Sequence, residues 1–126
     1  MPEAEAVDLL DELRALGARA LYLRSDVADL AGHGPVLDRI EAGLGPIDCL
    51  VGNAGIASPT RGDLLDMAPA SFAQVMAVNL EGAFFLTQAV ARRMLRAGDR
   101  PGRSIVLVTS VSAAMASIER GEYCIS

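Results

Sequence analysis

The sequence contains no lysine, and all eleven of its basic side chains are arginines. This absence excludes a Schiff-base amine, a P-loop lysine and a lysine-assisted acid from these 126 residues. Histidine occurs once, as His33 between two glycines, so a metal site or a histidine-based triad has almost nothing to draw on. Cys49 in an apolar run and Cys124 near the C-terminus form neither a disulfide framework nor a ligand cluster. We therefore expect no metal site.

Aromatic residues are also scarce, at 4% of a chain that is 52% hydrophobic, which indicates an aliphatic globular domain and not a disordered chain. Sixteen acidic against eleven basic residues give a net charge of −5, which offers no positive surface to nucleic acid or to an anionic membrane. No apolar stretch approaches the roughly 20 residues of a membrane-spanning helix. The acidic N-terminal residues are also unlike a signal peptide. We expect a cytoplasmic protein that binds neither nucleic acid nor membranes.

Hydrophobic periodicity alternates between helical and strand patterns along the chain. It predicts helices over residues 3–16, 35–44 and 71–97, and strands over residues 18–23, 47–52 and 103–109. This alternation predicts an α/β fold, a three-layer, doubly wound parallel sheet with three strands present. The strand over residues 47–52 is apolar enough to be buried on both faces. Because such a sheet usually begins with a strand and has five or six, we expect the central part of a longer domain.

Small polar residues stand at the carboxyl end of each of the three predicted strands. They are Ser25 and Asp26, then Asn53, then Thr109 and Ser110. In a parallel sheet these carboxyl ends lie side by side, where a ligand binds. Any one of these residues is more simply explained as a helix cap or a turn residue. Together, and with Asn53-Ala54-Gly55 permitting close backbone approach, they favour a ligand site.

Five short motifs succeed one another at characteristic spacings. They are Asp26-Val27, Asn53-Ala54-Gly55, Val78-Asn79-Leu80, Ser110 and Tyr123. In this order they resemble the short-chain dehydrogenases/reductases, and the resemblance covers essentially the whole chain. Residues 120–126 look most like the branch that includes 3-oxoacyl-acyl-carrier-protein reductases. The resemblance implies a partial NAD(P)-binding domain of the Rossmann type over residues 1–126. It also implies an oxidoreductase that reduces a small-molecule carbonyl to an alcohol, with a 3-oxoacyl thioester as a candidate substrate.

The resemblance implies that NAD or NADP is bound by residues after the first two predicted strands. Asp26 and Val27 would contact the adenine ring. Asn53, Ala54 and Gly55 would line the cofactor near its adenosine ribose. From the residues alone, Asp26 could instead cap the next helix.

Three further residues would carry the chemistry in the family that the chain resembles. Asn79 would help to hold a water in a proton relay, and Ser110 would hydrogen-bond the substrate carbonyl. Tyr123 would be the general acid or base and would also touch the cofactor. From the residues alone, Ser112 could be confused with Ser110, and Tyr123 could be an ordinary surface residue.

The family pattern includes two features that this sequence does not contain. One is a glycine-rich phosphate loop after a first strand. The other is a lysine four positions after the tyrosine, which would be position 127. A tyrosine phenol ordinarily has a pKa of about 10, so a nearby cation has to stabilise the phenolate. We therefore expect residues 1–126 alone to be inactive, and the alternative function is a catalytically silent binding or assembly module.

The predicted helix over residues 71–97 is apolar around most of its circumference. A helix that is apolar on more than one face is buried on more than one face. One face can cover the sheet, and we expect the other face, with Phe84 and Val90, to contact a second copy. The resemblance gives the same expectation of a homodimer or homotetramer. The alternative is a further layer of the same chain.

Overall fold

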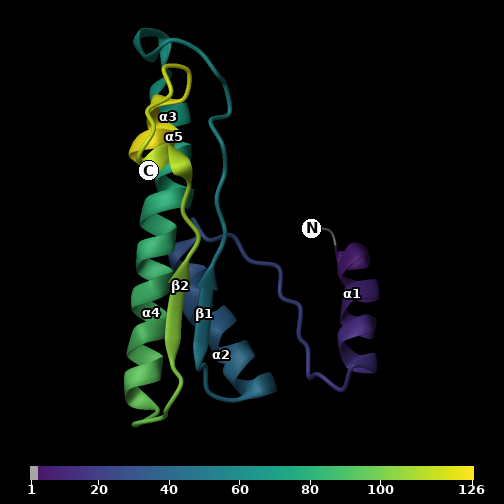
Figure 1. The fold of residues 1–126 in the computed structure, drawn as a ribbon. Helices are drawn as coiled ribbons and strands as arrows, with labels where there is room; N and C mark the ends of the chain where they lie inside the picture. Colours follow the sequence, from purple (N-terminus) through teal and green to yellow (C-terminus); the bar gives the residue numbers. More distant parts are fainter. Residues whose placement is uncertain (1–2) are drawn as a thin grey trace.

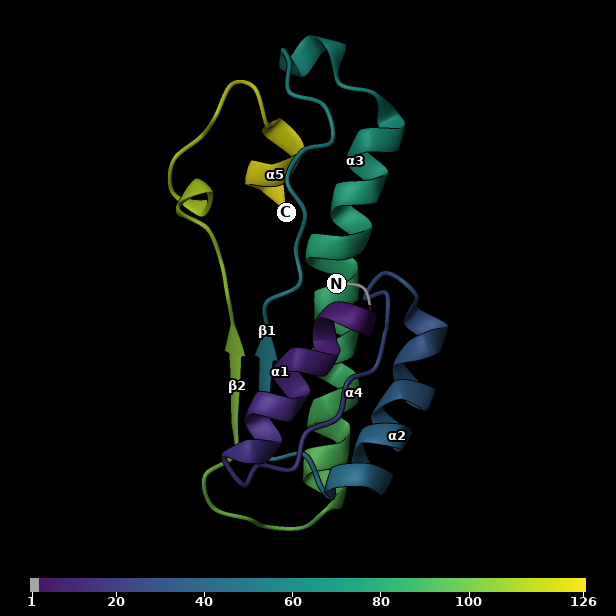
Figure 2. The ribbon, with the colours of Figure 1, turned by 90° about the vertical axis from the view of Figure 1, so that its right-hand side faces the viewer.

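The computed structural model describes residues 3–126 and places helices around a short parallel sheet (Figures 1 and 2). Its helices and strands are α1 (Glu3–Ala15), α2 (His33–Leu44), β1 (Cys49–Gly52), α3 (Pro69–Met76), α4 (Ala83–Arg96), β2 (Ser104–Leu107) and α5 (Gly121–Ile125). The α/β class, the parallel sheet and the three predicted helices are confirmed. Within residues 3–126, no helix is both long enough and apolar enough to cross a membrane.

Strands β1 and β2 pair in parallel, with Cys49 opposite Ser104 and Gly52 opposite Leu107. Beyond this register, the Val108 N–H donates to the Gly52 carbonyl at 2.9 Å. Both strands therefore end at the same edge of the sheet. The segments that follow β1 and β2 leave that edge side by side. This is the arrangement that we expected for the polar residues at the ends of these two strands.

The predicted strand over residues 18–23 is wrong, because this segment is extended but has no place in the two-stranded sheet. A strand needs a paired neighbour to supply its ladder of hydrogen bonds. In the strand order 3-2-1-4-5-6 of doubly wound sheets, strands 3 and 4 follow one another along the chain but are not neighbours in the sheet. Segments that follow one another along the chain can therefore lie apart in such a fold, and Figure 1 shows α1 and the segment after it apart from β1 and β2.

The core lies between α2, α4 and one face of β1. Its buried members are Leu37, Val90 and Met94, with half-buried Ile40, Ile47, Leu50, Leu86 and Ala89 packed against them. The prediction that residues 47–52 are buried on both faces is wrong, because Val51 on the opposite face is 59% exposed. The placement of Val90 on the outer face of the long helix is also wrong, because its side chain is 1% exposed.

A continuous helix connects β1 to β2, running through α3, a π-helical turn (Ala77–Gly82) and α4. Pro69 starts it and Gly98, with φ +79°, follows its end. From Pro69 to Arg96 it spans roughly 40 Å, whereas a strand of four residues spans about 13 Å. The helix therefore extends past the carboxyl ends of the strands, and Figure 1 shows α3 and α5 beyond the sheet.

Arg93 ties α4 to α2 on the same side of the sheet. Its guanidinium bonds Asp38 Oδ1 at 2.6 Å, Glu41 Oε2 at 2.5 Å and the Gly34 carbonyl at 3.1 Å. Burial would lower the pKa of Arg93, but hydrogen bonds and attraction from the two carboxylates outweigh it, so the pKa is raised. These contacts hold α2 in place, and with it the loop before α2.

Gly82 is the point where the loop before α2 crosses the long helix. A Cβ at this position would lie 2.4 Å from the Val27 carbonyl oxygen and 2.9 Å from that of Ala77. The backbone of Gly82 is helical, so alanine would suit the helix itself. We nevertheless expect Gly82→Ala to lower the free energy of unfolding by about 1–3 kcal/mol, because the added methyl group overpacks the crossing. Denaturant unfolding measures this effect.

Gly43→Ala is the matched control, since Gly43 also lies in a helix but in an open position. Its added Cβ would find its nearest neighbour, Leu21 Cδ2, at 3.4 Å. We expect this variant to be unchanged or more stable by up to about 1 kcal/mol. Equal effects of the two substitutions would contradict the close packing of Val27 on the long helix.

Candidate active site

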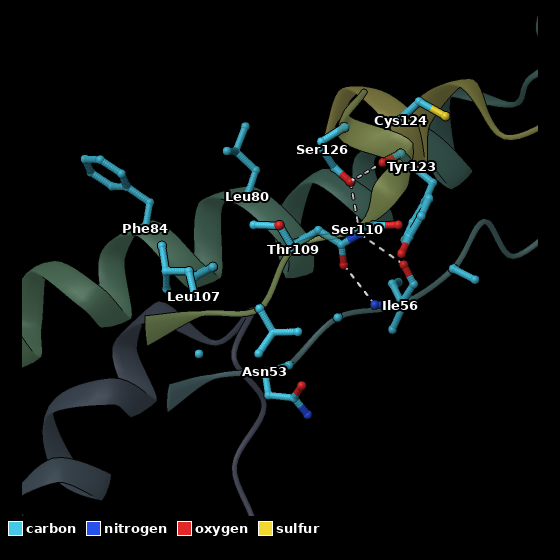
Figure 3. Close-up of a pocket in the computed structure, with 18 residues that line it drawn as sticks. Asn53, Ile56, Leu80, Phe84, Leu107, Thr109, Ser110, Tyr123, Cys124 and Ser126 are labelled. Atoms are coloured by element: carbon cyan, nitrogen blue, oxygen red, sulfur yellow. Dashed lines mark hydrogen bonds between the residues drawn. The ribbon is translucent and has the colours of Figure 1, made fainter. Parts of the chain in front are cut away.

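A cleft of about 460 Å³ opens at the carboxyl ends of β1 and β2 (Figure 3). Its walls come from the turn after β1, the π-helical turn, the residues after β2 and α5. Asn79, Ser110 and Tyr123, the three candidate catalytic residues, all line this cleft. Since they belong to three separate segments, the parallel sheet and its long crossover helix are what bring them together.

Ser110 follows β2 and caps the short 3₁₀ helix Val111–Ala113, where its Oγ accepts a hydrogen bond from the Ser112 N–H at 3.2 Å. A hydroxyl that accepts through a lone pair keeps its own hydrogen to donate. Ser110 can therefore cap the helix and still donate to a ligand oxygen in the cleft. Ser112 is buried and is not among the residues that line the cleft, which separates the two serines.

Tyr123 lies in α5, and its half-buried side chain faces the cleft in Figure 3. The guanidinium carbon of Arg120 lies 5.6 Å from the centre of its ring, within range of a cation–π interaction. The helix itself is five residues long, which is too short to be stable alone. The place of Tyr123 therefore depends on what α5 packs against.

Asn79 lies in the π-helical turn and uses its side chain to hold the turn after β1. Its Oδ1 accepts from the Ile56 N–H at 2.8 Å, and its Nδ2 donates to the Ile56 carbonyl at 3.0 Å. The same Nδ2 donates to Ser126 Oγ at 3.0 Å. Single π turns inside α-helices are frequent at functional sites. All three side-chain bonds of Asn79 are to protein groups, so its side chain shapes the cleft.

Asn53 is the first residue after β1, and it lines the cleft from an exposed position. In Figure 3 its amide points away from Tyr123 and Ser110. Ala54 and Gly55 line the same cleft and also a second one. The turn after β1 therefore separates two neighbouring clefts and contributes to the wall of each.

The second cleft contains the other candidate cofactor residues, Asp26 and Val27, together with Ala54, Gly55 and Ile56. The Asp26 carboxylate accepts from the Ala28 N–H at 2.9 Å, so it supports its own turn as well as lining the cleft. It does not cap α2. The two clefts share Ala54, Gly55 and Ile56 in their linings and therefore adjoin.

Val27 is held in this second cleft from two sides. Its carbonyl oxygen lies 2.7 Å from Nε2 of the buried His33, and because a carbonyl can only accept, Nε2 carries the hydrogen. The same Val27 carbonyl oxygen also packs closely against Gly82 of the long helix. The one histidine in the chain therefore has a structural role in positioning the loop.

A family model described as short chain dehydrogenase matches residues 2–126. The chain belongs to this family. The resemblance found in the sequence is thus confirmed, and so is the partial Rossmann-type fold, since solved members of the short-chain dehydrogenases superpose closely.

A 3-oxoacyl-[acyl-carrier protein] reductase from Brucella melitensis, solved in complex with NAD, superposes with a TM-score of 0.90 at 42% identity over 99% of this chain and 48% of its own. A gluconate 5-dehydrogenase from Burkholderia cenocepacia, in complex with NADP and tartrate, gives a TM-score of 0.83 at 35% identity over 98% and 47%. An L-rhamnose 1-dehydrogenase (NAD(P)(+)) from Azotobacter vinelandii is 38% identical over 95% of this chain and 45% of its own length. The chain spans about half the length of the curated relatives it matches.

Two residues that hold the segments around this cleft in place were missed by the sequence analysis, Glu122 and Ser126. Glu122 is 2% exposed, and its Oε1 accepts from Ser71 Oγ at 2.9 Å, which docks α5 on α3. Burial would raise the pKa of Glu122, but the hydrogen bond from Ser71 and one from its own backbone outweigh it, so the pKa is lowered. A glutamate in a polar segment gives no sequence signal of burial, because charged residues are mostly exposed.

The lowered pKa of Glu122 makes the stability of the fold depend on pH. A carboxyl group with a lower pKa in the folded state stabilises the fold above its unfolded pKa of about 4.3, and this contribution is lost as pH falls through the folded pKa. We expect Glu122→Gln to lower the free energy of unfolding at neutral pH by about 1–3 kcal/mol. Its stability should also fall less steeply with acidification than that of the unaltered chain. Unfolding curves at a series of pH values measure both effects.

The matched control is Glu119→Gln, which removes an exposed carboxylate three positions earlier. We expect it to leave the neutral-pH stability within about 0.5 kcal/mol. A Glu122→Gln variant with the same acid profile as the unaltered chain would contradict the assignment.

Proposed function

We propose that the protein to which this chain belongs is an NAD(P)-dependent oxidoreductase that interconverts a carbonyl and an alcohol by hydride transfer. The observation that carries this proposal is that Ser110 and Tyr123, which both bear hydroxyls, line one cleft at the carboxyl ends of two parallel strands. The relatives reported above are all named as dehydrogenases or reductases. Residues 1–126 alone are proposed to be inactive.

The shape of the site suits a long cofactor with two ends. The clefts on either side of Ala54 and Gly55 are neighbours, so one molecule can reach from Asp26 and Val27 to Tyr123. Asp26 and Val27 would contact adenine, and Asn53, Ala54 and Gly55 would line the adjoining ribose. When bound, NAD or NADP supplies or accepts the hydride.

The residues of this chain supply the proton and the charge stabilisation. Reduction of a carbonyl places negative charge on its oxygen, and a donor already aimed at that oxygen stabilises the charge. Ser110 would donate its hydrogen to that oxygen. Tyr123 would deliver the proton in reduction and take it back in oxidation. Asn79 would contribute to the proton relay through a water that it helps to hold.

For the substrate, a 3-oxoacyl thioester is the first candidate, supported by the 0.90 TM-score of the Brucella reductase. A sugar or sugar acid is the second candidate, supported by the rhamnose dehydrogenase at 38% identity. Parallel assays of the full-length protein separate the two: a short 3-oxoacyl thioester with NADPH or NADH, and L-rhamnose with NAD⁺ or NADP⁺. The higher kcat/KM identifies the class.

The test of the chemistry is Tyr123→Phe in the full-length protein, because this change removes the transferable proton and little else. We expect kcat to fall by roughly 10² to 10⁴, the usual contribution of general acid–base catalysis, with the Kd for NAD(P)H nearly unchanged. Steady-state kinetics and cofactor titration measure the two quantities.

Tyr22→Phe is the matched control, since it removes the same hydroxyl from a residue outside both clefts. We expect normal turnover from this variant. Near-normal turnover by Tyr123→Phe would show the catalytic assignment to be wrong. If the unaltered full-length protein shows no reduction of any carbonyl tested, the catalytically silent binding or assembly module becomes the better description.

We also infer that the outer face of the long helix contacts a second copy, giving a homodimer or homotetramer. Phe84 and Leu95 lie on this face and are 60% and 80% exposed, and Phe84 stands at its border with the first cleft, which it also lines. An adjoining face of the same helix already packs in the core through Val90 and Met94. An apolar stripe on the solvent side of a helix is typical of a helix that packs on both faces.

We expect Leu95→Asp to shift the full-length protein from oligomer to monomer, because burying an unpaired carboxylate at an interface costs several kcal/mol. Sedimentation velocity measures the shift. Leu16→Asp, at a position 84% exposed just after α1, is the control and should not change the assembly. A monomeric unaltered protein would contradict this inference.

A further inference from the structure

Ser126 connects the helix that carries Tyr123 to the long crossover helix. Its Oγ accepts a hydrogen bond from Asn79 Nδ2 at 3.0 Å and donates one to the Tyr123 carbonyl at 3.1 Å (Figure 3). The Ser126 hydroxyl thus accepts from one partner and donates its hydrogen to the other. An alanine at this position could do neither.

The hydrogen bonds continue from Asn79 to the turn after β1. The Asn79 amide holds both the N–H and the carbonyl of Ile56, at 2.8 and 3.0 Å. A series of bonds therefore runs from Ile56 through Asn79 and Ser126 to Tyr123. It joins the wall shared by the two clefts to the proposed general acid.

The amide of Asn79 depends on this arrangement. One Nδ2 hydrogen points to the Ile56 carbonyl, and the other is taken by Ser126 Oγ, so both donors have acceptors. Asn79 is only partly exposed, and a donor left without a partner in such a place is costly. Loss of the Ser126 hydroxyl would leave one Nδ2 hydrogen of Asn79 without its acceptor. We expect the hydrogen bonds between the Asn79 amide and Ile56 to weaken as a result.

The helix α5 is held to the long helix on both sides of Tyr123. Glu122, just before the tyrosine, bonds Ser71 in α3, and Ser126, three residues after it, bonds Asn79. The bond between Glu122 and Ser71 fixes α5 on α3. The bond between Ser126 and Asn79 connects α5 to the turn at Ile56, because the same Asn79 side chain also bonds Ile56.

We propose that Ser126 is a positioning residue that couples the backbone at Ile56 to the placement of Tyr123. Ser126 lines the cleft, and its hydroxyl bonds Asn79 and the Tyr123 carbonyl, so it acts through these two residues. The catalytic consequence rests on the function proposed above, whereas the coupling itself does not.

The coupling is tested by hydrogen–deuterium exchange of the full-length protein, followed in peptides that cover residues 53–58 and 121–126. In Ser126→Ala we expect the Ile56 amide, which donates to Asn79, to exchange about tenfold faster. Ser126→Thr keeps a hydroxyl and should restore slow exchange. Ser104→Ala is the matched control, because it removes the hydroxyl that bonds Cys49 Sγ at the other end of β2.

The positioning role is tested by kinetics on the same variants. We expect Ser126→Ala to lower kcat about tenfold while the KM for NAD(P)H stays within about twofold, since small misplacements of a reacting group mainly affect turnover. Ser126→Thr should recover most of the loss, and Ser104→Ala should behave as the unaltered protein.

Faster exchange confined to residues 121–126 would overturn the proposal, because Ser126 would then serve α5 alone. Faster exchange at Ile56 with unchanged kcat would also overturn it, because the bonds would not position the tyrosine. A full-length protein that reduces no carbonyl would refute the proposed function, and the exchange at Ile56 would then decide the coupling alone.

Discussion

The parallel pairing of β1 with β2 is the constraint on which the site depends. Parallel neighbours cannot be joined by a tight turn, so the chain must cross over, and here it does so through one continuous helix from Pro69 to Arg96. The helix is much longer than the strands, and its first half therefore extends past the sheet. That overhang supplies Asn79 to the cleft and gives α5 a surface to pack on.

The position of the proposed catalytic tyrosine depends on contacts between its short helix and the rest of the fold. A five-residue helix has little stability of its own, so the contacts of Glu122 with Ser71 and of Ser126 with Asn79 decide where Tyr123 lies. Both contacts are polar and directional. Directional bonds place a phenol more accurately than apolar packing of the same area would, because they weaken steeply away from their preferred angles.

Elements with strong periodicity were predicted well, and those that depend on neighbours were not. Helix α2 and the long helix follow from their apolar spacing and their Pro and Gly boundaries, and β1 and β2 from short apolar runs. Residues 18–23 have the same kind of apolar run, yet they form no strand, because pairing is a property of two segments. The exposure of Val51 has a similar origin: a strand can be apolar on both faces while one helical layer covers only one of them.

The sequence by itself determined the family, the order of the elements and the candidate residues Asn79, Ser110 and Tyr123, because these are read from residue types and spacings along one chain. The tertiary structure decided that the three share one cleft, that the turn at Ala54 and Gly55 separates two hollows, and that Glu122 and Ser126 hold the tyrosine helix. Burial and hydrogen-bond partners arise between segments far apart in the chain. A carboxylate or a hydroxyl has the same letter in the sequence whether it faces water or bonds a distant helix, so only the folded arrangement could distinguish them.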